Sequence, residues 1–214
     1  MSYFRVALLV FGVILCGCTT GTDALGPIAN EQVTAPASGS LQSGQRQVSR
    51  TWLINGLASS VEIIGSGFEG LGRKIPGSKS YSYSSLVESA TIIRSQVTRD
   101  IKQTHRKNPN VRINLIGFSY GANLMTWIVR ELAKDNIEVN YLATLEGPVL
   151  LSIPDNVRVA DNFSCTGLNC FRMNLKLAAG NSRTQLLNRK IRSSHVAMGG
   201  DETVHRIILK QISR

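Results

Sequence analysis

The sequence predicts an α/β fold, in which helices cover both faces of a mostly parallel sheet. Short apolar runs with the character of buried strands alternate with segments of helical period. One apolar run leads directly into a glycine-flanked turn and then into a helix, within residues 111–132. Alternation of this kind is typical of parallel strands joined by crossover helices, so we expect a single sheet built around that turn.

The composition is that of one ordinary globular domain. Of the 214 residues, 43% are hydrophobic and 18% are charged, which is enough to bury a layered core. The net charge of +10 arises from 24 basic and 14 acidic residues, and a diffuse positive field attracts any polyanion. Because the basic residues form no long run and do not interleave with aromatics, we expect a solvated basic surface and no nucleic-acid partner.

The N-terminus has the features of an export signal. Arg5 precedes an apolar run that is too short to span a bilayer comfortably. The run ends in Leu15-Cys16-Gly17-Cys18, which resembles the bacterial lipobox. This resemblance implies that residues 1–17 are removed and that Cys18 is lipidated as the first residue of the mature chain. A plain secretory signal or a short transmembrane anchor is the alternative.

The expected location is the bacterial cell envelope, lipid-anchored and facing the periplasm. Thr19 follows the lipidated cysteine where an acidic residue would direct retention, and by the same resemblance this favours the outer membrane. Residues 18–50 are rich in Gly, Ser, Thr, Ala and Gln without a sustained period. We interpret them as a flexible tether that leads to a folded domain over residues 51–214.

Export changes the interpretation of the remaining cysteines, because disulfides persist in an oxidising compartment. Cys165 and Cys170 lie five residues apart with a Gly and an Asn between them, and we expect them to pair and close a small surface loop. Two free thiols are the weaker alternative. A metal site needs more ligands than this stretch offers, so we expect no metal and no organic cofactor.

The expected elements follow the chain in order. The first strand stops at the turn Asn55-Gly56, and a helix begins at the capping box Ser85 to Glu88 and ends before Pro109. Strands are expected over residues 51–54, 111–116, 139–145, 157–160 and 186–191. A closing helix is expected over residues 202–212.

Gly117-Phe118-Ser119-Tyr120-Gly121 matches the G-x-S-x-G nucleophile elbow, with the strand before it and the helix after it that the motif requires. Ser119 is the predicted nucleophile. The turn is so tight that the flanking positions tolerate little side chain, which explains the glycines. The backbone N–H of Tyr120 would point at the oxyanion of a tetrahedral intermediate.

A serine becomes a good nucleophile only when a base takes its proton, and the chain order in such folds is Ser, acid, His. His195 is the predicted base, in the loop between the last strand and the last helix. We interpret His105 as a partner of a helix C-terminus and His205 as a residue on the wetter side of the closing helix. Glu146, at the end of the third strand, is the predicted acid, and Asp161, after the next strand, is the alternative.

The second oxyanion donor is expected in the loop after the first strand. We assign it to the backbone N–H of Leu57, with Ala58 as the alternative. Two other carboxylates have structural interpretations: Asp155 as a turn residue, and Asp201 as a helix N-cap.

With these motifs, residues 51–213 resemble the small, lidless bacterial α/β-hydrolases of esterase, lipase and thioesterase type. The resemblance rests on the Asn-Gly-Leu-Ala loop, the elbow, Ile-Pro-Asp-Asn-Val, and His195 followed by Met-Gly-Gly-Asp-Glu-Thr-Val-His. It implies hydrolysis of a carboxylic ester or thioester through an acyl-enzyme. Relatives commonly carry Asp-Pro where this chain has Glu146-Gly147-Pro148.

The substrate expected from this resemblance is a small-molecule or lipid-like acyl compound, bound in a shallow, open groove because no insertion is long enough to form a cap. A transacylase or peptidase would use the same residues. The rival function is a tethered envelope binding protein on a hydrolase scaffold with a weakened triad. The sequence does not indicate an oligomeric state.

Overall fold

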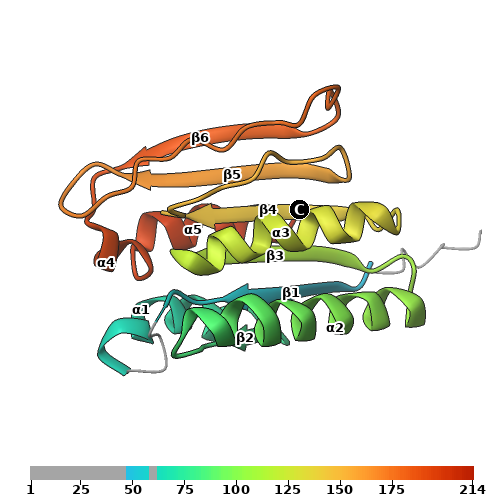
Figure 1. Ribbon diagram of the computed structural model, residues 1–214, viewed down its shortest axis with the longest axis horizontal. Helices are drawn as coiled ribbons and strands as arrows, with labels where there is room; N and C mark the ends of the chain where they lie inside the picture. Colours follow the sequence, from blue (N-terminus) through green and yellow to red (C-terminus); the bar gives the residue numbers. More distant parts are fainter. Residues whose placement is uncertain (1–46, 58–61) are drawn as a thin grey trace, which may run out of the picture. The chain divides into compact units, whose positions relative to one another are not determined.

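The computed structural model describes residues 47–57 and 62–214, which form a six-stranded sheet with helices on both faces (Figure 1). The strand order is β2-β1-β3-β4-β5-β6, and every neighbouring pair is parallel. The predicted α/β class with a parallel sheet is confirmed.

The six strands and the helices alternate along the chain. The strands are β1 (Ser49–Ile54), β2 (Lys79–Tyr81), β3 (Arg112–Phe118), β4 (Val139–Leu145), β5 (Val157–Cys165) and β6 (Gln185–Ile191). The helices are α1 (Glu62–Arg73), the π-helix η1 (Glu88–Ile93), α2 (Arg94–Lys107), α3 (Tyr120–Lys134), α4 (His195–Met198) and α5 (Glu202–Ile212).

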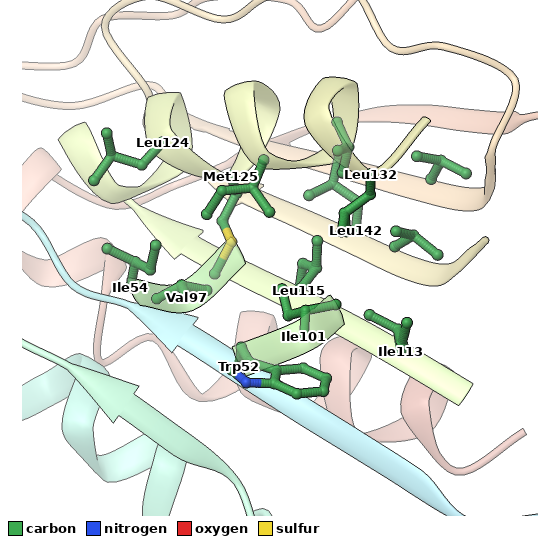
Figure 2. Packing of buried hydrophobic residues seen from close by; sticks show 14 of the residues in the cluster. Trp52, Ile54, Val97, Ile101, Ile113, Leu115, Leu124, Met125, Leu132 and Leu142 are labelled. Carbon is green, nitrogen blue, oxygen red and sulfur yellow. The ribbon is translucent and has the colours of Figure 1, made fainter. Parts of the chain in front are cut away.

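Two apolar clusters cover the two faces of the sheet, because successive side chains of a strand point to opposite sides. On one face, helices α2 and α3 pack on β1, β3 and β4; Figure 2 shows Val97 and Met125 from these helices against Ile54 and Leu115. On the other face, α1, α4 and α5 pack on the alternate residues of the same strands, among them Leu53 and Phe118. Both faces of the central strands are therefore buried, whereas the edge strands β2 and β6 stay largely exposed.

Three elements were not predicted: the helix α1, the short strand β2, and the short helix α4, which begins at His195 where the sequence suggested a loop. Helix α1 carries four glycines in Glu62–Arg73, which lowers its intrinsic helix propensity. One reason for them is close packing: a Cβ on Gly67 would lie 2.9 Å from the backbone nitrogen of Gly200. The first strand also begins at Ser49, two residues before its predicted start.

The helix predicted from Ser85 starts with a π-helical turn before α2 begins. The Ser85 hydroxyl accepts a hydrogen bond from the Glu88 backbone at 3.2 Å, as a capping box requires. The Glu88 carboxylate, however, accepts from the backbone and hydroxyl of Ser84. Its hydrogen bonds from Ser84 lower the pKa of the Glu88 carboxyl.

The carboxyl ends of all six strands lie on one edge of the sheet, because the strands are parallel. From β1 the chain adds β2 on one side of the sheet and then β3 to β6 on the other, so the strand order reverses between the neighbours β1 and β3. Sites in open α/β sheets occur at such a switch point, outside the carboxyl ends of the strands. The fold thus places the loop after β1 beside the turn after β3.

The described residues contain no helix long and apolar enough to cross a membrane. The expected signal peptide, Cys18 and nearly all of the tether lie outside the described residues, as does Ala58.

Candidate active site

Ser119 occupies a strained turn between β3 and α3. Its backbone has φ 54° and ψ −126°, a conformation that residues with side chains rarely adopt. The turn is pinned on both sides, since Ser119 N–H donates to the Leu145 carbonyl at 2.7 Å and the Ser119 carbonyl accepts from Ala122 at 3.0 Å. The local structure required of a nucleophile elbow is therefore present at this residue.

The two flanking glycines have no room for a side chain. A Cβ on Gly117 would collide with the backbone of Gly121 and Ala122. A Cβ on Gly121 would collide with the backbone carbonyls of Ile54 and Asn55. The second collision means that α3 starts in direct contact with the end of β1, which brings the loop after β1 against the elbow.

His195 lies opposite Ser119, on the first residue of α4. Its Nε2 atom is 3.1 Å from the Ser119 hydroxyl oxygen, across 76 positions of sequence. The ring is held between two aromatic side chains, with Phe118 stacked at 5.4 Å and Phe171 edge-on at 4.9 Å. The Ser194 side chain caps the short helix by accepting from Ala197. These contacts orient the ring toward the serine.

Glu146 lies on the far side of the imidazole, directly after β4. It is buried, and its backbone also has positive φ, at 49°. Its Oε2 atom is 3.6 Å from Nδ1 of His195, while the two carboxylate oxygens accept hydrogen bonds of 2.7 Å from the backbone N–H groups of Cys165 and Phe171. Ser119, His195 and Glu146 thus lie in the spatial order of a nucleophile, a base and an acid.

The alternative acid, Asp161, is elsewhere, and the position predicted for it was wrong. Strand β5 runs on to Cys165, so Asp161 lies inside the strand and not after it. It is fully buried, and its carboxylate accepts from the Tyr141 hydroxyl at 2.9 Å and from Arg189 at 3.0 Å. Burial, followed by the proximity of Asp161, raises the pKa of Tyr141 well above its usual value.

His205 does not lie on the wetter side of α5, as the sequence suggested. It is buried, with Nε2 2.8 Å from the Gly199 carbonyl and Nδ1 3.2 Å from the Lys74 ammonium. These partners require a neutral ring that donates from Nε2 and accepts at Nδ1. Burial, and then the Lys74 charge, lower the pKa of His205.

The two residues assigned to the oxyanion site lie in the two segments that adjoin the serine. Tyr120 is the first residue of α3 and directly follows Ser119. Leu57 follows Gly56, whose added Cβ would lie 3.1 Å from Cβ of Ser119. The Asn55 side chain accepts from the Gly56 backbone at 2.8 Å, which shapes this loop against the elbow.

Cys165 and Cys170 form the predicted disulfide, with 5.5 Å between their Cα atoms. Their sulfurs and the Glu146 carboxylate lie within 4.8 Å of one another, a spacing compatible with metal ligands. Sulfurs bonded to each other offer no thiolate ligand. The cluster is therefore a disulfide packed beside a buried carboxylate.

Phe171 belongs to the site although the sequence predicts no role for it. It contributes a backbone donor to Glu146 and a ring edge to His195. The available signal was its position directly after Cys170, because the disulfide returns this part of the chain to the end of β5.

No family model matches the chain, and no curated protein matches it. Among solved structures, it is similar to the type II thioesterase BorB from the borrelidin biosynthetic cluster, with 9% identity over 78% of this chain and 94% of that chain and a TM-score of 0.50. The NocB thioesterase domain from the nocardicin cluster has 11% identity over 78% and 94% of the two chains, with a TM-score of 0.49.

A cutinase-like protein from Cryptococcus sp. has 14% identity over 77% of this chain and 95% of that chain, with a TM-score of 0.44. At such identities the likeness identifies the fold alone. Together with the six-stranded parallel sheet, it establishes a minimal α/β-hydrolase fold.

Proposed function

We propose that this chain is a serine hydrolase that cleaves a carboxylic ester or thioester through an acyl-enzyme. The observation that carries the proposal is the 3.1 Å approach of His195 Nε2 to the hydroxyl oxygen of Ser119, held on a backbone at φ 54°. A serine on a strained turn beside an oriented imidazole is the arrangement that activates a hydroxyl for nucleophilic attack.

In the proposed reaction, Ser119 Oγ attacks the acyl carbonyl carbon while His195 Nε2 accepts the hydroxyl proton. The backbone N–H groups of Tyr120 and Leu57 donate to the oxyanion that forms. Collapse of this intermediate breaks the bond to the alcohol or thiol, which leaves with the proton from His195. Water then attacks the acyl-serine by the same route, and His195 again carries the proton.

Glu146 stabilises the imidazolium that forms at each proton transfer. Its Oε2 atom lies 3.6 Å from Nδ1, longer than a hydrogen bond, and such contacts commonly shorten when substrate binds. The carboxylate is buried and has backbone donors on both oxygens. These two backbone donors therefore hold the carboxylate in place on one side of the imidazole.

The surroundings of the site support a lipid-like acyl substrate. Leu168 and Val196 are 79% and 64% exposed, and both adjoin His195 through the backbone: Val196 is the next residue, and the Leu168 carbonyl accepts from the His195 backbone at 3.1 Å. Exposed apolar side chains grouped at a site provide a surface for an apolar ligand. BorB, one of the similar structures, is a thioesterase by its name.

A second candidate function is an envelope binding protein on a hydrolase scaffold, with weakened catalysis and a basic surface that holds an anionic polymer. The observation in its favour concerns Nδ1 of His195, which is buried and has no hydrogen-bond partner in the described part of the chain. A triad in which Nδ1 of His195 stays without a hydrogen bond to Glu146 would turn over substrate slowly.

Labelling with a fluorophosphonate probe separates the two candidates. The wild type should label and Ser119→Ala should not, whereas Ser213→Ala, which changes a serine at the end of α5, should label at the wild-type rate. A folded wild type that fails to label would refute the hydrolase and support the binding protein.

The envelope anchor is part of the same proposal. Cys18→Ser should abolish incorporation of a labelled fatty acid and release the protein from the membrane fraction, while the matched variant Cys16→Ser should keep both. The fluorophosphonate labelling rate of the released domain should not change. Lipid incorporation into Cys18→Ser would contradict the assignment of the anchor.

A further inference from the structure

We propose that the Cys165–Cys170 disulfide is a positioning device for the reaction: it holds the loop that fixes the Glu146 carboxylate against His195. This inference rests on the proposed hydrolase function. It assigns to the two cysteines a role in turnover beyond closing a surface loop.

The loop supplies both backbone donors to the acid. The Cys165 N–H donates to Oε1 of Glu146 at 2.7 Å, and the Phe171 N–H donates to Oε2, also at 2.7 Å. Cys165 is the last residue of β5 and is held there by the sheet. Phe171 lies beyond the strand, directly after Cys170, so the disulfide is the covalent link that returns its N–H group to the carboxylate.

The same loop also contacts the base. The Leu168 carbonyl accepts from the His195 backbone at 3.1 Å, and the Phe171 ring meets the imidazole edge-on at 4.9 Å. The Gly167 N–H donates to the Ser193 carbonyl at 2.9 Å, two residues before the base. One closed loop therefore touches the acid and the base together.

The conformation of the loop is one that an unlinked chain would leave readily. Asn169 and Arg172 have positive φ, at 56° and 55°; asparagine tolerates this conformation, but it is unfavourable for Arg172, two residues beyond Cys170. The Arg172 guanidinium braces the loop through the Thr166 carbonyl at 3.2 Å. Without the bridge, Phe171 would be free to withdraw its N–H group from Oε2.

If Oε2 of Glu146 loses the Phe171 donor, the carboxylate can rotate about its side-chain torsions. Its distance to Nδ1 of His195 is then no longer fixed. Loss of a group that orients a catalytic side chain commonly costs 10- to 100-fold in activity. We therefore expect reduction of the disulfide to lower kcat by about tenfold or more through the carboxylate, whereas any change in KM reports the separate contribution of Leu168 to the substrate surface.

The test compares oxidised and reduced forms of the full chain. Dithiothreitol supplies two electrons and two protons, becomes the cyclic disulfide, and leaves two thiols that iodoacetamide traps for counting by mass. Fluorophosphonate labelling rates and ester turnover are measured on both forms, after near-UV circular dichroism shows that each is folded. The Cys165→Ala/Cys170→Ser variant should match the reduced form and should not respond to dithiothreitol.

The Glu146→Ala background separates positioning from a general loss of structure. If the disulfide acts through the carboxylate, reduction should slow the wild type about tenfold or more and leave the residual rate of Glu146→Ala unchanged. An equal fold-loss in both backgrounds would overturn the proposal, as would an unchanged rate in the reduced wild type. Should the cysteine variant fail to fold, the reduced and oxidised pairs in these two backgrounds still decide the question. Failure of the oxidised wild type to label would overturn the hydrolase function as well.

Discussion

Oε2 of Glu146 lies 3.6 Å from Nδ1 of His195 while it accepts a 2.7 Å hydrogen bond from the Phe171 backbone. The carboxylate is thus shared between the loop after β5 and the imidazole. Both neighbours come from segments beyond β5, whereas Glu146 itself directly follows β4. The distance between the acid and the base is therefore set by three separate segments at the sheet edge: the end of β4, the loop after β5 and the start of α4.

Glu146→Gln should lower kcat for an activated ester on the order of 10³-fold, because the neutral amide no longer stabilises the imidazolium. The matched amide substitution, Asp161→Asn, should leave kcat nearly unchanged. It should instead lower the free energy of unfolding by about 1–3 kcal/mol, since it weakens the buried bonds to Tyr141 and Arg189. Loss of turnover in Asp161→Asn with retention in Glu146→Gln would reassign the acid.

Gly121→Ala should destabilise the fold by at least about 2 kcal/mol, because its Cβ would collide with the backbone carbonyl of Ile54. Labelling of Ser119 should slow with it, as the loop after β1 is pushed from the elbow. Gly70→Ala is the control: its Cβ would meet only the end of the Arg73 side chain at 3.7 Å, so helix propensity should make it neutral or stabilising by about 0.5–1 kcal/mol. Urea unfolding of both variants measures this, and equal losses would refute the steric argument.

Unfolding free energy should fall as pH drops below about 6.5, the pKa of an unperturbed histidine. The pKa of His205 is lowered in the folded state, first by burial and then by Lys74. The unfolded chain therefore binds a proton that the folded chain refuses, and stability is lost by at most about 1.4 kcal/mol per pH unit. His205→Gln should flatten this dependence in urea titrations between pH 5 and pH 7.5, whereas His105→Gln should not. An unaltered slope in His205→Gln would exclude the buried ring as its source.

Asp201→Ala should cost about 1 kcal/mol of unfolding free energy. The Asp201 carboxylate caps α5 by accepting from the backbones of Thr203 at 2.9 Å and Val204 at 3.2 Å. Asp201→Asn keeps an acceptor oxygen in place and should lose much less. Thermal or urea unfolding ranks the three proteins, and a loss in Asp201→Asn as large as in Asp201→Ala would show that charge, and not the cap, is what matters.

The features that the sequence predicted well are local ones. The turn at Ser119 is encoded by two glycines within a few residues, and their lack of space explains the motif directly. The disulfide pairs two cysteines five residues apart. The cap at Asp201 involves the next three residues. Each of these can be read from neighbours along the chain.

The errors came from contacts between distant segments. Polar residues such as Asp161 and Asn162 resemble a strand end, yet β5 continues through them because Tyr141, Thr144 and Arg189 on other strands satisfy them. The glycines of α1 argue against a helix, but close packing against Gly200 requires at least one of them. Neither fact is visible without the partner segment.

The sequence alone determined the α/β class, the position of Ser119 on its elbow, and the Cys165–Cys170 pair. Only the tertiary structure decided which carboxylate stands beside His195 and showed that Phe171 joins it. The physical reason is that a buried polar group is placed by its hydrogen-bond partners, and here those partners lie on neighbouring strands and loops far away in sequence.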